Sequence, residues 1–287
     1  ILTAAAPGSP FARTHGMHGT HATYSPPTHV KHVVCEMGGK NALIIDTSAD
    51  LDEAVLAARH SAFGFQGQKC SACSRLIVVD PAGPRGPAFR HVVDRLVEAT
   101  KALVVGDPTR PGTDVGPVID AEAAAKIRGY IDRGRVSGLE CHQIGVPTTG
   151  EFAARSASRL VPPTIFVNVP ENHELATDEI FGPVLAVMHA SSFDEALRIA
   201  NQLPYKLTGG VFSRKPSHIE QAKRDFRVGN LYLNRGITGA LVGRQPFGGF
   251  GMSGVGSKAG GADYLLQFVE PRASCENTMR RGFAPEL

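Results

Sequence analysis

Residues 42–79 read ALIIDTSADLDEAVLAARHSAFGFQGQKCSACSRLIVV, and their pattern sets the fold class. The first four residues are an apolar run bounded by polar residues, which is typical of a buried strand. Asp50 and Glu53 form a capping-box pattern, which predicts the start of a helix. Apolar residues then recur on one helical face at Leu51, Val55, Ala58 and Ala62. Because residues 75–79 read as another strand, the stretch predicts a strand–helix–strand unit.

The same alternation continues along the rest of the chain. A long amphipathic helix is marked by residues at helical spacing, namely Phe89, Val92, Val93, Leu96, Val97, Thr100 and Leu103. Further helices are predicted over 121–133, from a Ser192 cap to residue 200, and over 218–226, with strands at 184–188, 210–212 and 231–233. This alternation predicts an α/β fold with a largely parallel sheet flanked by helices. Residues 134–160 are predicted to form an irregular surface excursion.

Composition excludes several classes of protein. The chain has 287 residues, of which 42% are hydrophobic and 20% charged, so it can bury a sizeable core and is not disordered in bulk. Its formal net charge of +3 is spread along the chain, and no basic stripe predicts a nucleic-acid partner. No apolar run approaches the ~20 residues that cross a bilayer, so we expect no membrane partner.

Five cysteines are too few, and odd in number, for a secreted disulfide framework. They indicate a reducing compartment, which we expect to be the cytoplasm, or the mitochondrial matrix in a eukaryote. Five of the eleven histidines fall in residues 1–32, where the spacing of His15, His18 and His21 could suggest a metal site. Since no cysteine or carboxylate lies there at ligand spacing, we predict an irregular lead-in and no metal.

Four segments carry residue types suited to chemistry, and the first is residues 35–40, CEMGGK. Glu36 stands just before a Gly-Gly pair that leads into the first strand. An acid in this place can act as a general base, because glycines let the backbone approach a ligand closely. The alternative is a surface glutamate at the entry of a strand.

The second segment, residues 65–75, holds Cys70 in a loop between the predicted helix and strand. A loop cysteine can present its sulfur in a cleft, and the neighbouring Lys69 would favour the nucleophilic thiolate. Three other interpretations stay open. Cys70 and Cys73 could form a redox pair or half of a zinc site, or either could be a small buried hydrophobic residue.

The third and fourth segments are weaker by themselves. Residues 178–183, DEIFGP, place an acid pair before an aromatic residue and a Gly-Pro turn, which can hydrogen-bond a ribose diol and flank a flat ring. Residues 236–254 hold seven glycines. Such a loop exposes backbone N–H groups that can hold an anion, although it can equally be a flexible connector.

The ordered set of these four segments resembles the aldehyde dehydrogenase superfamily, from about Val33 to the C-terminus. Three stretches carry the resemblance further: GFQGQKCSACSR at 64–75, NRGITGALVGRQPFGGFGMSG at 234–254 and SKAGGADYLLQFVEPR at 257–272. They are similar to the members that oxidise L-glutamate γ-semialdehyde in proline catabolism. The resemblance implies an enzyme, with NAD as its cofactor and a small aldehyde as its substrate.

The resemblance also implies roles for individual residues. Cys70 matches the nucleophile that forms a thiohemiacetal and then a thioester, and Glu36 matches the base that activates water for hydrolysis. The residues that match cofactor contacts are Glu179 for the nicotinamide ribose, Phe181 beside the ring, and Met37 and Gly38 in the nicotinamide pocket. Those that match contacts to the amino-acid end of the substrate are Ser71, Gly239, Ala240 and Phe247.

The chain departs from the family in one large respect, because the family's Rossmann-like NAD domain is mostly absent. We expect residues 1–36 to be a remnant of that domain or an irregular lead-in, residues 37–255 the catalytic domain, and residues 256–287 a C-terminal helix and oligomerisation strand. Residues 264–271 resemble that strand, which predicts a homo-oligomer. Alone, the chain should bind NAD weakly or not at all.

Two alternatives remain beside the leading interpretation. The same mechanism could act on another semialdehyde, such as that of succinate or methylmalonate. The chain could also be a truncated, non-catalytic remnant that keeps the fold.

Overall fold

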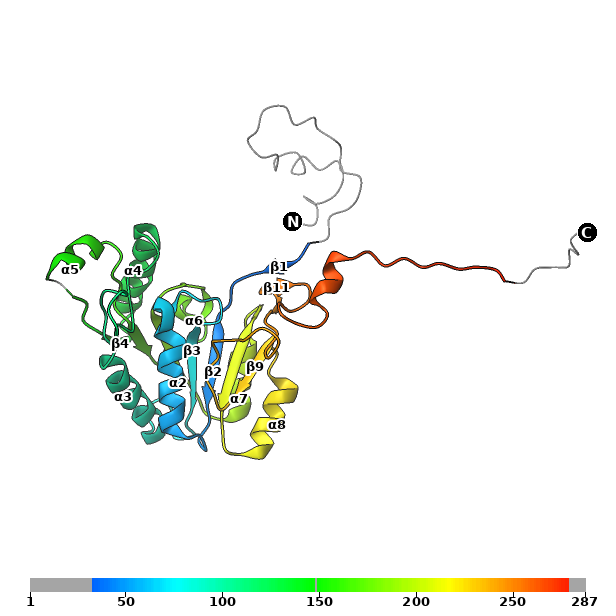
Figure 1. The fold of residues 1–287 in the computed structure, drawn as a ribbon. Helices are drawn as coiled ribbons and strands as arrows, with labels where there is room; N and C mark the ends of the chain where they lie inside the picture. The colour runs from blue at the N-terminus through cyan, green and yellow to red at the C-terminus, as the bar shows by residue number, and fades with distance from the viewer. Residues whose placement is uncertain (1–32, 148, 279–287) are drawn as a thin grey trace, which may run out of the picture.

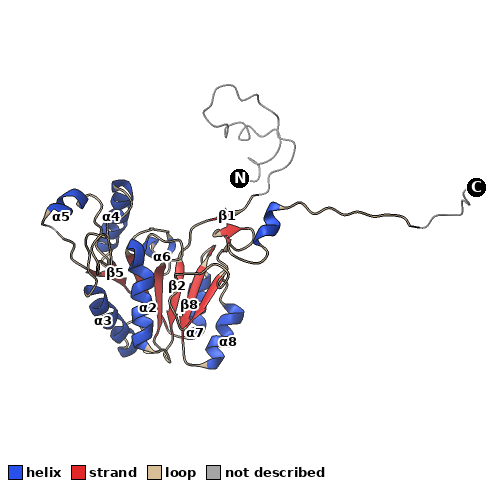
Figure 2. Cartoon of the chain, viewed as in Figure 1, coloured by secondary structure: helices blue, strands red, loops and turns tan. Residues whose placement is uncertain are grey.

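The computed structural model describes residues 33–147 and 149–278, and its centre is a seven-stranded sheet. The strands lie in the order β4-β5-β6-β3-β2-β8-β9, and every neighbouring pair is parallel except β4 and β5. Helices cover both faces of this sheet (Figure 1 and Figure 2). The predicted α/β fold with a largely parallel sheet is confirmed.

The strands of the sheet are short and mostly buried, as expected for parallel strands covered on both faces. Their bounds are β2 Asn41–Ile45, β3 Cys73–Val79, β4 Glu140–Gln143, β5 Thr164–Val167, β6 Val184–Ala190, β8 Thr208–Phe212 and β9 Asn230–Leu233. Two antiparallel pairs are separate from this sheet. They are β1 (Cys35–Glu36) with β11 (Gly254–Val255), and β7 (Tyr205–Lys206) with β10 (Phe250–Gly251).

Two helices begin at the caps that the sequence predicts. Asp50 and Ser192 cap α2 and α7, because each side chain accepts the N–H of a glutamate three residues on. The bounds are α2 Leu51–Phe63, η2 Gly64–Gly67, α3 Pro87–Lys101, α4 Ala121–Val136, α5 Glu151–Ser156, α6 Glu174–Thr177, α7 Phe193–Asn201, α8 Pro216–Asp225 and η3 Tyr264–Phe268. None of these helices in residues 33–147 and 149–278 is long and apolar enough to cross a membrane.

Two apolar cores lie on the two faces of the sheet, because successive side chains of a strand point to opposite faces. Ile44 and Ile77 belong to the core that α4, α6, α7 and α8 cover. Leu43 and Leu76 belong to the core that α2 and α3 cover. The sheet is therefore sealed on both faces, and only its two edges, where strands begin and end, are open for a site.

We call these the amino edge and the carboxyl edge. Residues 38–40 lead into β2, residues 70–72 into β3 and residues 178–183 into β6, so they share the amino edge. Asp46 follows β2 and Ser213 follows β8, so they share the carboxyl edge. Since β6, β3 and β2 are neighbours, the first three sequence segments suited to chemistry meet at one place.

Residues 134–160 contain more regular structure than predicted. Helix α4 continues to Val136, β4 pairs with β5, and α5 follows, so the prediction of an irregular excursion is wrong. The sequence ECHQ of β4 has no apolar alternation because this edge strand is partly exposed. Strand β5 and helix α6 escape prediction because each has only four residues.

The C-terminal part of the described chain leaves the body of the molecule. Helix η3 exposes three large apolar side chains, Leu265, Leu266 and Phe268, and the chain beyond it runs outward (Figure 1). The oligomerisation strand expected in residues 256–287 stays a prediction, as do the expected boundaries at residues 36 and 255. The histidine-rich residues 15–21 lie outside the described residues.

Candidate active site

The loop before Cys70 has an unusual backbone. Phe65, Gln66 and Gly67 all lie in the left-handed region, with φ of 57°, 58° and 64°. This conformation is strained for the two residues that carry side chains. A Cβ on Gly67 would collide with the carbonyl oxygen of Gly182, so only glycine allows the loop to pack against the segment before β6. The backbone turns sharply just before Cys70.

Two side-chain amides anchor this loop from other elements. Gln68 accepts the N–H of Ile119 at 2.9 Å. Asn41, the first residue of β2, donates to the carbonyl oxygens of Cys70 and Ala72. The sequence analysis does not identify Asn41, because its partners are brought to it only by the folded sheet.

The thiol of Cys70 is partly exposed, and its surroundings disfavour the thiolate. Burial raises its pKa, and the nearby carboxylates of Glu36 and Glu179 raise it further. Hydrogen bonds from the backbone of Ser71 and of Cys70 itself act in the opposite direction. Both carboxylates are therefore within electrostatic reach of the sulfur, so Glu36 and Cys70 are not on opposite sides of the molecule.

Lys69 does not have the effect predicted for it. Its ammonium lies over the ring of Phe65, 5.6 Å from the centroid. Burial raises the pKa of Cys70, and the charge of Lys69 is not among the main influences on that pKa, so Lys69 does not favour the thiolate as expected. The physical reason is that burial is the largest influence on the pKa of this sulfur, and the backbone hydrogen bonds of Ser71 and Cys70 only partly offset it.

Glu36 lies in β1, opposite Gly254 of β11, and is exposed. One of its carboxylate oxygens lies 3.2 Å from the place where a Cβ on Gly248 would stand, so the glycine-rich loop passes close beside it. Partial burial raises the pKa of Glu36, and the positive charge of Lys258 lowers it. A carboxylate with a raised pKa is better suited to accept a proton near neutral pH.

The carboxylate of Glu179 lies against the glycine pair before β2, Gly38 and Gly39. Its carboxylate accepts the N–H of Gly39 at 2.8 Å, and it lies where a Cβ on Gly38 would stand. Phe181 has a left-handed φ of 59° and is 41% exposed, and Met37 is 42% exposed. A carboxylate, a glycine cradle and two exposed apolar side chains are suited to a ribose diol and a flat ring, and so fit the nicotinamide end of NAD.

The hydrogen bonds that hold Ser71 and Phe247 in place are made by their backbone groups. The carbonyl of Ser71 accepts the hydroxyl of Thr208 at 3.4 Å, and Ser71 is 8% exposed. Phe247 exchanges two backbone hydrogen bonds with Ala259, at 2.9 and 2.7 Å, and is half-buried. Both belong to segments at the amino edge, and their predicted contacts with a substrate stay predictions.

Gly239 and Ala240 lie in the long loop after β9. The start of this loop is anchored where Ile237 donates its N–H to the hydroxyl of Ser61 at 3.2 Å. Gly239 has a φ of 79°, is exposed, and has no atom within 4 Å of the place where a Cβ would stand. No contact recorded for the described residues joins these two residues to Cys70, so their role also stays a prediction.

Lys40 is a buried cation that the sequence analysis does not single out. It is 1% exposed, and its Nζ has no hydrogen-bond partner among the described residues. Burial, and next the charge of Arg75, lower its pKa to about 7. Arg75 is equally buried, but its guanidinium donates to the carbonyls of Lys40, Ile199 and Ala200, each at 3.0 Å.

Cys73 packs in the apolar core, as one of the sequence alternatives predicts. It is 1% exposed, and burial raises its pKa to about 12. A redox pair with Cys70 would need an accessible thiol at Cys73, and Cys73 is buried. In the part of the chain that the structure describes, no three His, Cys, Asp or Glu side chains come together in a way that could hold a metal ion.

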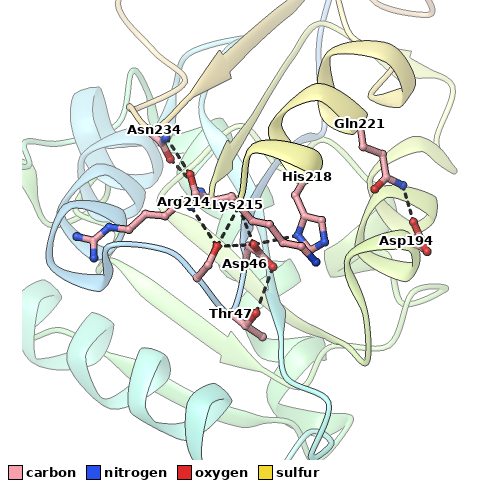
Figure 3. A network of polar contacts seen from close by, with 10 residues as sticks. Asp46, Thr47, Asp194, Arg214, Lys215, His218, Gln221 and Asn234 are labelled. Carbon is pink, nitrogen blue, oxygen red and sulfur yellow. Dashed lines mark hydrogen bonds and ion pairs between the residues drawn. The ribbon is translucent and has the colours of Figure 1, made fainter.

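A second polar cluster lies at the carboxyl edge (Figure 3). The carboxylate of Asp46 accepts hydrogen bonds from Ser213 at 2.6 Å, Ser48 at 2.8 Å and the ring of His218 at 3.0 Å. The ring of His218 stacks on Phe193 with 4.2 Å between centroids. Burial acts to raise the pKa of Asp46, but the hydrogen bonds from Ser213, Ser48 and His218 together lower it.

Comparison with known proteins adds to this geometry. A model of the aldehyde dehydrogenase family matches residues 17–273. The chain is 48% identical over 247 residues to the 1-pyrroline-5-carboxylate dehydrogenase of Geobacillus thermodenitrificans (strain NG80-2). This match covers 86% of the chain and 45% of the relative, so the chain spans about half the length of the curated relatives it matches.

Two solved structures resemble the fold closely. Proline utilization A (PutA) from Bdellovibrio bacteriovorus, inactivated by N-propargylglycine, has a TM-score of 0.79 and 52% identity, over 90% of this chain and 25% of that chain. The 1-pyrroline-5-carboxylate dehydrogenase from Thermus with bound NAD has a TM-score of 0.75 and 46% identity, over 85% of this chain and 44% of that chain.

Proposed function

Because the chain belongs to the aldehyde dehydrogenase family, we propose that it is the catalytic part of an NAD-dependent dehydrogenase that oxidises L-glutamate γ-semialdehyde to L-glutamate in proline catabolism. The grouping of Cys70, Glu36 and Glu179 at the amino edge carries this proposal. Both carboxylates influence the sulfur, although the three residues come from separate segments of the chain. A thiol, a base and a ribose-binding carboxylate are the groups that such a reaction needs.

Cys70 performs the first step. Its thiolate adds to the aldehyde carbon, so a carbon–sulfur bond forms and the carbonyl becomes an oxyanion. The backbone N–H of Cys70 stabilises part of this negative charge. The turn at residues 65–67 and the anchors from Gln68 and Asn41 hold the attacking residue in place.

NAD, when bound, supplies the acceptor for the hydride that leaves the thiohemiacetal, which thereby becomes a thioester. Glu179 would hold the ribose hydroxyls, with Phe181, Met37 and Gly38 around the ring. In the described chain the Glu179 carboxylate lies where a Cβ on Gly38 would stand and accepts the N–H of Gly39.

Glu36 performs the last step. Its carboxylate takes a proton from water, the hydroxide attacks the thioester carbon, and the carbon–sulfur bond breaks to release the acid. Its raised pKa supports this role, because a stronger base accepts the proton more readily. The side chain of Glu36 in β1 is exposed, so water can reach it.

The substrate assignment has support of its own. Relatives named 1-pyrroline-5-carboxylate dehydrogenase are 46–48% identical to the chain. Ser71, Gly239 and Ala240 would hold the carboxylate and ammonium end, and Phe247 would pack on the aliphatic stem. Several neutral donors that converge can bind a carboxylate without a cation.

The assembly and the compartment belong to the same proposal. Exposed apolar side chains at η3, such as Leu265 and Phe268, are suited to contact a second copy of the chain. Five free cysteines fit a reducing cytoplasm. Light scattering during size-exclusion chromatography tests the oligomer, and a purely monomeric enzyme would contradict it.

Activity of the completed enzyme tests the proposal. The chain would be co-expressed with the part of the Geobacillus thermodenitrificans relative that it does not match, and NADH formation would be followed by absorbance. We expect turnover of glutamate semialdehyde to exceed that of succinate semialdehyde by about tenfold or more. The Cys70→Ala variant should lose about a thousandfold in rate or more.

Matched variants separate the possible outcomes. Cys73→Ala should leave the rate nearly unchanged, since Cys73 packs in the core. Equal rates for Cys70→Ala and the parent would contradict the proposed role of Cys70 as the nucleophile. A preference for succinate or methylmalonate semialdehyde would show that the substrate assignment is wrong. A co-expressed enzyme that folds but shows no turnover would favour the alternative of a non-catalytic remnant.

A further inference from the structure

Asn41 occupies a central position in the sheet, at the start of the strand between β3 and β8. It is 3% exposed, yet both polar atoms of its side chain have partners on neighbouring segments. Nδ2 donates to the carbonyl oxygens of Cys70 at 2.7 Å and Ala72 at 2.9 Å. Oδ1 accepts the N–H of Thr208 at 3.0 Å. One amide therefore joins the loop before β3 to the first residue of β8.

Among side chains of this size, only an amide satisfies all three partners. Two donors face two carbonyl oxygens, and one acceptor faces an N–H, which also settles which atom is nitrogen and which is oxygen. An aspartate would place a carboxylate oxygen against the carbonyls of Cys70 and Ala72. A leucine would remove the donor from both carbonyls, of which that of Ala72 is buried, and this is costly.

The carbonyl that Asn41 holds belongs to the peptide unit between Cys70 and Ser71. Because a peptide unit is planar and trans, fixing the carbonyl oxygen also fixes the N–H of Ser71 on the opposite side. The backbone of Ser71 is one of the two hydrogen-bonding groups that lower the pKa of Cys70 and so favour its thiolate. A hydrogen bond to the carbonyl also polarises the N–H and strengthens its donation.

The geometry therefore points to Asn41 as a positioning residue, which holds the Cys70–Ser71 peptide so that its N–H is aimed at the Cys70 sulfur. This inference rests on the proposed function only in taking Cys70 as the reacting thiol. Burial and the charges of Glu36 and Glu179 all oppose the thiolate, so the remaining favourable donors have a large influence on its reactivity. The residue that holds the peptide unit, Asn41, is 29 positions from Cys70 in the sequence.

Thiol alkylation tests this inference on the chain itself, without cofactor or substrate. Iodoacetamide forms a bond between the sulfur and a methylene carbon and releases iodide, so the rate reports the thiolate. We expect Asn41→Leu to shift the half-maximal pH of Cys70 alkylation upward by about one unit, and to slow it about tenfold at neutral pH. Tandem mass spectrometry separates Cys70 from Cys73, which share the tryptic peptide 70–75.

Thr208→Val provides the matched control. It removes the hydroxyl bond to the carbonyl of Ser71 but keeps the backbone N–H that Asn41 accepts. This variant should change the rate by less than about twofold. An unchanged pH profile in a folded Asn41→Leu variant would overturn the inference, as would an equal shift in both variants.

Nuclear magnetic resonance of the unmodified chain decides the matter even if Asn41→Leu does not fold. The amide of Ser71 and the side-chain amide of Asn41 should titrate together with the Cys70 thiol. A Ser71 amide that does not respond to thiol ionisation would overturn the inference. Neither measurement depends on turnover, so an Asn41 effect without dehydrogenase activity would count against the proposed function alone.

Discussion

The two edges of the sheet hold polar clusters of opposite character. At the carboxyl edge, Asp46 is 2% exposed and its carboxylate accepts hydrogen bonds from Ser48, Ser213 and His218. At the amino edge, Lys40 is 1% exposed and its Nζ lacks a partner among the described residues. A cluster whose groups satisfy one another stabilises the fold, whereas buried groups that remain unsatisfied or perturbed mark a place suited to chemistry.

This contrast runs against a general rule for α/β sheets. Strand β2 leads through α2 to β3, and β8 leads through α8 to β9, so the connections diverge between β2 and β8. Ligands usually bind beyond the carboxyl ends of strands at such a point. Here that place has a hollow of about 270 Å³, but its two acids are paired, Asp46 with His218 and Asp194 with Gln221. The unpartnered ammonium of Lys40 and the thiol of Cys70 lie at the opposite edge.

Removing Asp46 should have the largest effect on stability. Asp46→Ala leaves the ring of His218 and two hydroxyls without their buried acceptor, so we expect a loss of about 3–4 kcal/mol in the free energy of unfolding. Urea unfolding followed by circular dichroism measures it. Thr47→Val is the control, since its bond to Asp46 is long at 3.5 Å. A loss below about 1 kcal/mol for Asp46→Ala would show that the cluster does not stabilise the fold.

Acid should weaken the same cluster. The pKa of Asp46 is lowered in the folded chain, so its contribution is fully present above its ordinary pKa of 3.8 and is lost as the pH falls below that value. Asp46→Asn should therefore show a smaller loss of stability on acidification than the parent. Unfolding curves at pH values on both sides of 3.8 test this, and parallel acid profiles would contradict it.

At the amino edge, Gly67→Ala should destabilise by about 2 kcal/mol. The added Cβ meets the backbone carbonyl of Gly182, and the φ of 64° is unfavourable for alanine. The displacement should also disturb the nearby Cys70 and slow its alkylation. Gly83→Ala is the matched control, because Gly83 has a φ of 97° but nothing within 4 Å of its Cβ position. Equal losses in both variants would mean that strain alone, and not packing, limits this loop.

Lys40→Met should stabilise the fold, by about 1–2 kcal/mol at neutral pH, since it removes an unpaired buried ammonium. Burial lowers the pKa of Lys40 from 10.5 to about 7. Between these values the unfolded chain binds a proton that the folded chain has lost, so this residue makes stability rise with pH. The advantage of Lys40→Met should shrink from about pH 7 towards about pH 9, and a constant difference would contradict the assignment.

Gly38→Ala should have the smallest effect on stability. Its Cβ meets the carboxylate at the far end of the flexible Glu179 side chain, which can swing away, so we expect a loss below about 1 kcal/mol. The bond to the N–H of Gly39 should be lost in the process. Unfolding measurements give the first effect, and the amide resonance of Gly39 gives the second. A cost as large as that of Gly67→Ala would show that Glu179 is held rigidly.

Local patterns were sufficient for the elements that bury a continuous apolar stripe. The caps at Asp50 and Ser192 and the helix that contains Phe89 and Leu96 are predictable, because a few adjacent residues carry the whole signal. Strand β4 is not, since ECHQ pairs through its backbone and leaves its side chains partly exposed. The spacing of apolar residues predicts α3 as far as Leu103, two residues beyond its end at Lys101.

The candidate site divides in the same way. Cys70, Glu36 and Glu179 are recognisable from local motifs and from the order of those motifs along the chain. Lys40 and Asn41 are not, although they stand in the same segment as Glu36. Nothing local shows that the ammonium of Lys40 is buried without a partner, or that Asn41 faces Cys70 and Thr208.

The sequence by itself determined the class of fold, the family and the reactive residue types, because periodicity, caps and motifs are properties of neighbouring residues. Only the tertiary structure decided which edge of the sheet holds the site and what the field at the Cys70 sulfur is. Burial, the direction of a peptide N–H and the distance between charges depend on segments that meet only when the parallel strands align. For that reason the expected help from Lys69 was wrong, and the hold of Asn41 on Cys70 could not be foreseen.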